Sequence, residues 1–438
     1  MIPTRKPEIL STETIKPYCT KQNQHPTIHN LSFFDQISSH IYLPFVFFYT
    51  KHVSNTKSTL LLKESLSAAL SRYYPLAGRI RDDFSVDCND EGVDFLEARI
   101  DCKLSEILKN PEDETLKILL PDDLQYKDPT LSSLLIVQVT LFECGGMALA
   151  ICISHKVMDI ASMCYFINNW AAIAKNPDEK MGPEFNLGYL YLPIDLPVME
   201  VYEPEKVKCV SKRIVFYGSK IDKLKATAAK EVKNPTRVEV VTAILHKTAI
   251  SAARARSGSL KSTVMHNAAN LRTRLFPPLP ESTAGNISGT FPVSTTEESD
   301  IEVALLANKI NKEKSKYFSS CGKENISAEE LCSLVLEAST GLRLSHGSNQ
   351  DVYLCSSYCR FPFYGADFGW GKPVWVTVAN CEVKNVIVLM DTRGGDGIEA
   401  YVTLEEHEMG LFESNEELLA FATINPSPLV ETNIEDDM

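Results

Sequence analysis

The most informative stretch of this sequence is Met147-Ala148-Leu149-Ala150-Ile151-Cys152-Ile153, which is followed directly by Ser154-His155-Lys156-Val157-Met158-Asp159. Seven residues without a charge indicate a fully buried strand, and residues 160–172 predict a helix directly after it. Strand ends in layered α/β sheets are places where ligand clefts form. His155 stands at such an end, and an imidazole with its ordinary pKa of about 6.5 can accept a proton near neutral pH. Taken alone, however, an HxxxD pattern more often marks a packed structural histidine.

Length and charge narrow the classes of protein to consider. A chain of 438 residues predicts two domains of roughly 200 residues each. The net charge of −13 argues against binding to nucleic acid or to anionic membranes, because both require basic patches. No apolar run approaches the roughly 18–20 residues that span a bilayer, and the first residues lack the apolar core of a signal peptide.

The twelve cysteines are scattered along the chain, several of them within apolar runs. This distribution fits reduced thiols in the cytoplasm. No cysteine or histidine set has the spacing of a zinc site, so we expect no metal.

The pattern of apolar residues and turns predicts alternating strands and helices on both sides of a proline-rich stretch. Residues 175–207 contain prolines and acidic residues without periodicity, which is typical of a linker or a covering loop. We therefore expect an N-terminal domain at 1–180, a crossover loop at 181–210 and a C-terminal domain at 211–438. Residues 89–92 are the clearest hairpin signal. We expect strands at 44–49, 78–80, 84–88, 93–100, 133–143, 147–153, 212–217, 264–269, 371–380 and 383–391, and helices at 59–73, 160–172, 219–229, 236–255, 301–317, 327–338 and 404–420.

A second landmark is Asp367-Phe368-Gly369-Trp370-Gly371-Lys372-Pro373. Two glycines around a tryptophan allow a tight turn beside a large aromatic anchor. Together with the HxxxD stretch, this segment resembles the pattern of the plant BAHD acyltransferases. Other segments are similar to further motifs of that family: Leu31-Ser32-Phe33-Phe34-Asp35-Gln36, Tyr73-Tyr74-Pro75-Leu76-Ala77-Gly78-Arg79, Asn270-Leu271-Arg272-Thr273-Arg274 and Gly285-Asn286.

The resemblance implies a fold and a mechanism. It implies a monomer of two similar-sized α/β domains like chloramphenicol acetyltransferase, with mixed sheets flanked by helices and a solvent channel at their interface. The N-terminal domain would be completed by the strand region near 365–387. His155 would be the general base that deprotonates an acceptor hydroxyl as the oxygen attacks the thioester of an acyl-CoA. The acyl-CoA is then a co-substrate, and neither a permanently bound cofactor nor a metal is required.

The other motif residues are expected to have structural roles. The resemblance implies that Asp159 forms an ion pair with Arg272, although its spacing from His155 also allows a triad-like relay. Asp367, Gly369, Trp370 and Gly371 would shape the channel near the coenzyme without touching the reacting atoms.

The chain departs from the family pattern at Ile160, where most members carry glycine, and the bulky Met158 precedes Asp159. We expect these two side chains to alter packing behind the base and to narrow the channel. Residues 391–397 have the composition of an exposed turn, although Thr392 and Arg393 could border the coenzyme. His246 and His266 are most simply packed or surface histidines.

The resulting prediction is an acyl-CoA-dependent O-acyltransferase of plant specialised metabolism that transfers acetyl or another short acyl group. Residues 86–93 and 391–393 resemble the branch that contains vinorine synthase-like alkaloid acetyltransferases and acylsugar acyltransferases. The expected acceptor is therefore an alkaloid or an acylated sugar. Two alternatives stay open at this point: a non-catalytic member that binds a metabolite or a partner, and an N-acyltransferase.

Overall fold

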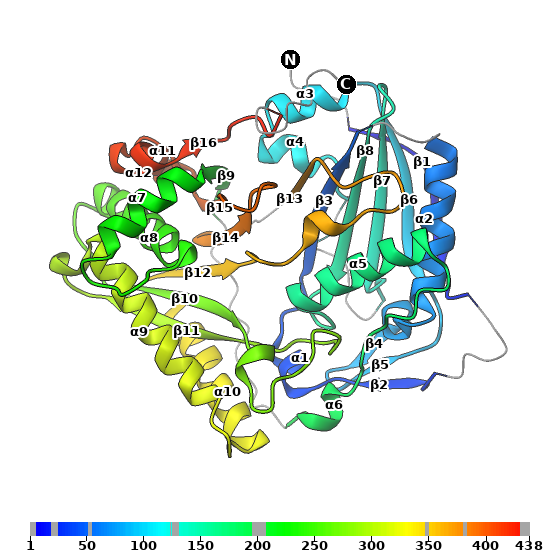
Figure 1. The fold of residues 1–438 in the computed structure, drawn as a ribbon, viewed down its shortest axis with the longest axis horizontal. Coiled ribbons are helices and arrows are strands. Elements are labelled where there is room, and N and C mark those ends of the chain that lie inside the picture. Colours follow the sequence, from blue (N-terminus) through cyan, green and yellow to red (C-terminus); the bar gives the residue numbers. More distant parts are fainter. Residues whose placement is uncertain are drawn as a thin grey trace.

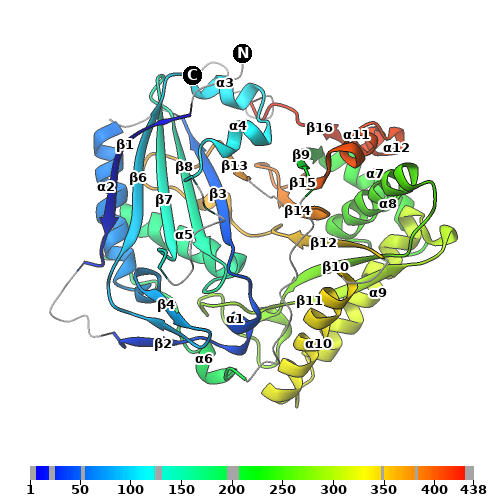
Figure 2. The same cartoon turned by 180° about the vertical axis from the view of Figure 1, so that it is seen from behind.

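The computed structural model describes residues 6–18, 25–50, 55–122, 124, 131–194, 207–346, 350–379 and 383–429. It has two halves that lie side by side, each built on one large β-sheet (Figure 1). The view from behind shows the same division, with α1 (Phe33–Ile37) and the ends of β10 (Thr263–Asn270) and β11 (Ser288–Thr295) at the seam between the halves (Figure 2).

The first half contains a six-stranded mixed sheet whose only parallel pair is β6 with β7. Alternate residues of β3 enter two different cores, because successive side chains of a strand point to opposite faces. Phe45 and Phe47 pack toward α2 and α5, whereas Val46 and Phe48 pack toward α3 and α4. The strand order is β1 (Glu8–Ile15), β6 (Val93–Ile100), β7 (Leu135–Phe142), β8 (Met147–Ser154), β3 (Tyr42–Tyr49) and β13 (Trp375–Val378), and the helices are α2 (Asn55–Leu70), α3 (Leu104–Lys109), α4 (Asp113–Lys117) and α5 (Ile160–Lys175).

The strand β8 lies inside this sheet, between β7 and β3, and every one of its residues is buried. Helices cover both faces of the sheet, which explains why the sequence here is continuously apolar rather than alternating. The predicted buried strand and the helix that follows it are confirmed, and β8 pairs antiparallel with β7.

The second half contains a seven-stranded mixed sheet with helices packed on one face (Figure 1). Met390 and Tyr401 on its other face join the apolar core of the first half. The strand order is β11 (Ser288–Thr295), β10 (Thr263–Asn270), β12 (Asp351–Ser357), β14 (Val386–Asp391), β15 (Ile398–Glu405), β9 (Cys209–Phe216) and β16 (Thr423–Ile424), and the helices are α7 (Gly218–Ala228), α8 (Arg237–Ser257), α9 (Val303–Cys321), α10 (Ala328–His346), α11 (Glu406–Glu413) and α12 (Glu416–Phe421).

A small third sheet lies below the first in the view of Figure 1. Its strand order is β2 (Ile28–Asn30), β5 (Ser85–Asp87) and β4 (Arg79–Asp82). The hairpin prediction at 89–92 is wrong, because β5 pairs with β2 and β4, whereas β6 pairs with β1 and β7. Gly92 has φ +94°, and a Cβ there would meet the carbonyl oxygen of Ile15 on β1 at 2.6 Å. The turn therefore passes the chain from the small sheet to the large one.

Part of the chain after β12 crosses from the second half to the first. There, β13 pairs with β3, and the Trp375 ring stacks on Phe48 with ring centroids 5.3 Å apart. The chain then returns to the second sheet as β14. The predicted strand at 371–380 is confined to the four residues of β13. The one or two helical pieces expected at 404–420 are the two helices α11 and α12, and they begin only at Glu406 because Leu404 still pairs with Val210 in the sheet.

The predicted crossover loop contains the short helix α6 (Leu187–Leu190) and an isolated bridge from Glu184 to Thr283. Residues 195–206 of that loop lie outside the described residues.

Candidate active site

His155 directly follows β8, and its backbone N–H donates to the carbonyl of Ile41 at 2.8 Å. Its side chain is half-buried, whereas residues 156–160 after it are buried. The helix α5 begins at Ile160 with Asp159 as its N-cap, whose Oδ1 accepts from the N–H of Ser162 at 2.9 Å. A side-chain acceptor at this position satisfies an N–H group that has no partner within the helix. The motif thus places the imidazole where the strand ends and the carboxylate where the helix begins.

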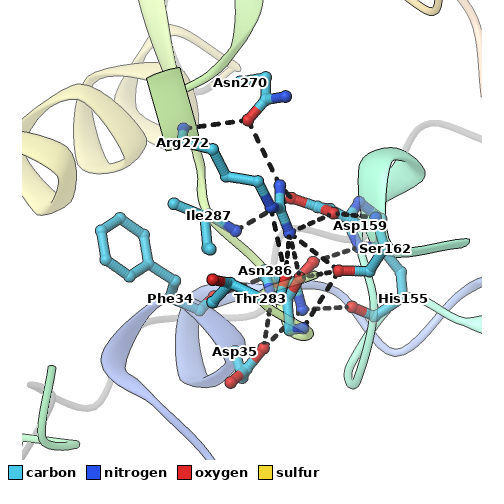
Figure 3. A network of polar contacts seen from close by, with 12 residues as sticks. Phe34, Asp35, His155, Asp159, Ser162, Asn270, Arg272, Thr283, Asn286 and Ile287 are labelled. Carbon is cyan, nitrogen blue, oxygen red and sulfur yellow. Dashed lines mark hydrogen bonds and ion pairs between the residues drawn. The ribbon is translucent and has the colours of Figure 1, made fainter. Parts of the chain in front are cut away.

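Asp159 is bound to Arg272 from the second half and is turned away from His155 (Figure 3). Arg272 Nη1 donates to Asp159 Oδ2 at 2.7 Å, and Nη2 donates to Oδ1 at 3.0 Å. Burial favours a raised pKa of Asp159, but the charge and hydrogen bonds of Arg272 outweigh burial, and the pKa lies below its ordinary value. No hydrogen bond joins Asp159 to His155 in the described part of the chain, so a triad-like relay has no support in this geometry.

Arg272 also ties the loop after it to the start of α5. Its guanidinium donates to Ser162 Oγ at 2.8 Å and to the carbonyls of Thr283 and Gly285 at 3.2 and 3.0 Å. The side chain is buried, and all of its neighbours in this cluster are acceptors. Such a site suits a guanidinium, which carries five donors in a rigid planar arrangement.

Asn286 contacts the imidazole from the same loop: its Oδ1 lies 3.0 Å from His155 Nδ1 (Figure 3). The amide nitrogen Nδ2 donates to the carbonyl of His155 and to Asp35 Oδ1, both at 2.9 Å. Those two partners can only accept, so the oxygen of the amide must face Nδ1, which must then carry a proton.

A neutral His155 with its proton on Nδ1 keeps a lone pair on Nε2. In the described part of the chain Nε2 has no hydrogen-bond partner. This nitrogen is not fully buried, so solvent can reach it. This geometry leaves His155 with one protonated ring nitrogen, Nδ1, and one unprotonated ring nitrogen, Nε2, that is able to accept a proton. The sequence analysis quotes Asn286 as part of a motif but assigns it no function. The sequence signal that could have identified it is a polar residue directly after a glycine, and in the structure this glycine, Gly285, has a φ of +123°.

The comparison with known families now agrees with the geometry. The family model described as "Transferase family" matches residues 6–419. The chain belongs to the BAHD acyltransferase family. It is accordingly an acyl-transferring enzyme, and the alternative of a non-catalytic member is set aside.

Two relatives and one solved structure show how similar the chain is to known BAHD proteins. It is 41% identical to diaboline synthase from Strychnos sp, covering 95% of this chain and 92% of the relative. It is 40% identical to 17,18-epoxy-17-hydroxycur-19-ene N-malonyltransferase from Strychnos nux-vomica, covering 95% and 90%. The crystal structure of vinorine synthase superposes with a TM-score of 0.83 at 34% identity, covering 96% of this chain and all of that one. This likeness confirms the predicted fold class and branch.

The second BAHD motif lies at the other end of α5 from His155. Asp367 Oδ1 accepts from the N–H groups of Gly369 and Gly371, both at 2.9 Å, and its Oδ2 lies 3.2 Å from Lys175 Nζ. Asp159 directly precedes α5, and Lys175 is the last of the sixteen residues of this helix. The two residues are therefore about 24 Å apart along the helix axis. The motif thus lies far from His155.

The aromatic residues of this motif pack on the first sheet. Trp370 stacks on Phe368 with centroids 5.6 Å apart, and Phe368 meets Trp170 of α5 edge-on at 4.9 Å. Gly369 and Gly371 have φ of +108° and +105°, a backbone region that glycine adopts without steric cost. This packing is compatible with a structural function for the four motif residues, which stays a prediction, as does their proximity to the coenzyme.

The remaining sequence predictions have simple structural counterparts. Residues 392–397 form the turn between the antiparallel strands β14 and β15, and Thr392 Oγ1 accepts from the N–H of Gly397 at 3.1 Å. His246 and His266 are both buried, and burial lowers the pKa of His246 to about 3. Met158 and Ile160 are buried in the core of the first half.

Within the described residues there is no group of histidine, cysteine or acidic side chains that could hold a metal. Nor is any helix of the described chain long and apolar enough to cross a membrane. A surface cavity of about 140 Å³ lies between α6 and the start of α10, and the residues that line it do not include His155. The channel past His155 stays a prediction.

Proposed function

We propose that this enzyme transfers an acyl group from acyl-CoA to a hydroxyl of a plant specialised metabolite, with His155 as the general base. The observation that carries the proposal is the contact between Asn286 Oδ1 and His155 Nδ1, which leaves the lone pair on an accessible Nε2. A positioned base of this kind typically contributes about 10²–10⁴-fold to the rate.

The proposed reaction proceeds through a ternary complex without a covalent acyl-enzyme. Nε2 takes the proton of the acceptor O–H while the oxygen attacks the thioester carbonyl carbon. The tetrahedral intermediate then collapses, the C–S bond breaks, and the leaving thiolate takes the proton from the imidazolium. Holding both substrates beside one base supplies the orientation that the reaction needs.

The ion pair between Asp159 and Arg272 supports this step indirectly. Arg272 joins the start of α5 to the loop that carries Asn286, and the N–H of Ile287 donates to Asp159 Oδ2 at 3.0 Å. We propose that both residues are structural and that their purpose is to hold Asn286 against the imidazole.

The acceptor we propose is an alkaloid or an acylated sugar, and the donor is acetyl-CoA or another short acyl-CoA. N-acylation is the second candidate, because a relative at 40% identity is named an N-malonyltransferase. Deprotonation of an amine as it attacks would use the same Nε2. We further propose that the enzyme acts as a cytoplasmic monomer, for which sedimentation in solution is the test of the oligomeric state.

The test is thiol release from acetyl-CoA and malonyl-CoA with a panel of hydroxylated alkaloids, their amine counterparts and sucrose esters. His155→Ala should lower kcat by about 10²–10⁴-fold. The matched control is His407→Ala, which changes an exposed histidine on α11 and should leave kcat unchanged. Turnover that survives His155→Ala would refute the general-base assignment, and comparison of alcohol and amine acceptors of one skeleton decides between O- and N-acylation.

A further inference from the structure

Asp35 is a buried carboxylate that the proposed reaction does not use directly. It is 2% exposed and lies on α1 (Phe33–Ile37), where Ser32 is the N-cap. Its Oδ2 accepts from the N–H of Ser32 at 2.8 Å and from Ser32 Oγ at 2.6 Å. Its Oδ1 accepts from the backbone N–H of Asn286 at 2.7 Å and from Nδ2 of the same residue at 2.9 Å.

A helix cap does not require the second pair of contacts. The capping box of α1 is complete with Ser32 and one carboxylate oxygen. The other oxygen reaches out of the helix to a residue 251 positions away in the chain, and that residue touches the imidazole. Asp35 Oδ1 is thus the acceptor that faces Asn286 on the side away from His155 (Figure 3).

This contact determines how the Asn286 amide is oriented. With Asp35 present, Nδ2 has an acceptor for each of its two hydrogens, Asp35 Oδ1 and the carbonyl of His155. Without Asp35, one Nδ2 hydrogen and the backbone N–H of Asn286 would be buried and unpaired, which is costly. The amide and its loop would then move to find other partners, and His155 Nδ1 would lose its acceptor.

The helix that carries Asp35 is anchored to the second half of the molecule, although it comes early in the chain. Phe33 and Phe34 are buried in the core of the second half, and Phe34 meets Tyr191 edge-on with centroids 5.1 Å apart. Asp35 and Asn286 therefore belong to the same packed body and reach across the seam to His155, which belongs to the first sheet.

Lys156 attracts the Asp35 carboxylate electrostatically, but within the described residues neither Lys156 nor the pair of Asp159 and Arg272 forms a hydrogen bond with that carboxylate. Lys156 Nζ donates to the carbonyl of Gln36 at 2.9 Å, and Asp159 and Arg272 pair with each other. Burial raises the pKa of Asp35, and its four hydrogen-bond donors oppose that effect. All four donors are matched to an acceptor-only carboxylate.

We propose that Asp35 is a positioning residue for the proposed reaction: it holds the Asn286 amide in the orientation that accepts the Nδ1 proton of His155 and so keeps Nε2 free as the base. The inference rests on the proposed function for its catalytic consequence, but the tautomer of His155 can be observed without any substrate.

The direct test is the tautomer of His155 in the full-length protein labelled with ¹⁵N in its histidine side chains. Long-range ¹H–¹⁵N spectra at pH 8.5 distinguish Nδ1–H from Nε2–H imidazoles, and the signals of His155 are those missing from His155→Ala. We expect Nδ1–H in the unmodified protein and conversion toward Nε2–H in Asp35→Ala. Asn286→Ala, which removes the acceptor itself, is the positive control. Where Asp35→Ala does not fold, Asp35→Leu, which fills the space without an acceptor, is the test variant.

The kinetic test uses thiol release from acetyl-CoA with any acceptor that the panel identifies. Asp35→Ala should lower kcat by about 10–100-fold, while KM for acetyl-CoA changes less than about threefold. The matched control is Ser38→Ala, which removes a hydroxyl that donates to the carbonyl of Phe34 at 2.8 Å at the end of α1. The removed hydroxyl binds neither the Asp35 carboxylate nor Asn286, and the backbone N–H of Ser38, which donates to the carbonyl of Asp35 at 3.2 Å, is kept, so kcat should be unchanged.

An Nε2–H imidazole in the unmodified protein would overturn the proposal, as would a folded Asp35 variant that keeps the Nδ1–H tautomer. A changed tautomer with unchanged kcat would overturn the catalytic part. The two proposals fail in different ways: turnover that persists in His155→Ala refutes the general base, whereas the tautomer of His155 reports on Asp35 whether or not that base is used.

Discussion

Replacing Arg272 with alanine is expected to be among the most destabilising single changes at the seam between the halves. The side chain is 1% exposed, and its removal leaves the Asp159 carboxylate buried with only the N–H groups of Ser162 and Ile287 as partners. Breaking a buried ion pair by removing one partner costs about 3–5 kcal/mol. The carbonyl of Thr283 also loses its contacts with the guanidinium, so we expect a value near the upper end of that range.

The loss of unfolding free energy in Arg272→Ala should be smaller at low pH than at neutral pH. In the unmodified protein the pKa of Asp159 is lowered, so its contribution to stability is complete above its unfolded pKa of about 3.9 and is lost as the pH falls through the folded pKa. In Arg272→Ala only the N–H groups of Ser162 and Ile287 still oppose the effect of burial, so the pKa of Asp159 rises. Protonation then relieves the buried charge, so the stability difference between the two proteins should shrink from pH 7.5 to pH 5.

Urea unfolding of both proteins at the two pH values measures this difference, because the free energy of unfolding falls linearly with denaturant. Asp159→Asn combined with Arg272→Ala should be more stable than Arg272→Ala alone, since the neutral amide leaves no unpaired charge. A loss below about 1 kcal/mol at pH 7.5, or an equal loss at both pH values, would contradict the interpretation of a desolvated charge.

Three further changes test buried contacts at the start of α5, in the second sheet and near the C-terminal end of the described chain. Ile160→Gly removes a buried side chain at the start of α5 and should lower the free energy of unfolding by about 3 kcal/mol, against about 1 kcal/mol for the control Ile160→Val; equal urea midpoints would contradict it. Glu399→Gln leaves the buried Arg213 without its ion pair, 2.6 Å away, and should cost about 3–5 kcal/mol, with an unchanged thermal midpoint as the opposing result. Leu429→Ala empties a buried position in the core shared with α3 and α4 and should cost about 2–4 kcal/mol, measured by urea unfolding together with faster hydrogen exchange in those helices; unchanged exchange would show that the C-terminal segment does not support them.

Elements with strong local signals were predictable from the sequence. The strand β8 and the helix α5 follow from an uncharged run and a helical pattern, and both are confirmed. The strands β1, β2, β11, β12, β15 and β16 were not predicted. In β1, with the sequence Glu8-Ile9-Leu10-Ser11-Thr12-Glu13-Thr14-Ile15, most residues are exposed, so no buried face produces an alternating pattern that marks the strand.

The turn at 89–92 shows a different kind of failure. Its composition is typical of a hairpin, but the partner of each flanking strand is set by contacts distant in sequence. A local signal can show that the chain turns, but it cannot show which strands pair afterwards.

The family, the fold class and the position of one imidazole at a strand end could be inferred from the sequence, because each rests on local patterns and ordered motifs. The residues that surround this imidazole became known only from the folded chain. Asp35 comes from the N-terminal part of the chain, Arg272 and Asn286 come from one segment of the second half, and all three meet His155 and Asp159 at the seam. Hydrogen-bond geometry, which spacing cannot specify, turned Asp159 away from the imidazole and placed the Asn286 oxygen against Nδ1.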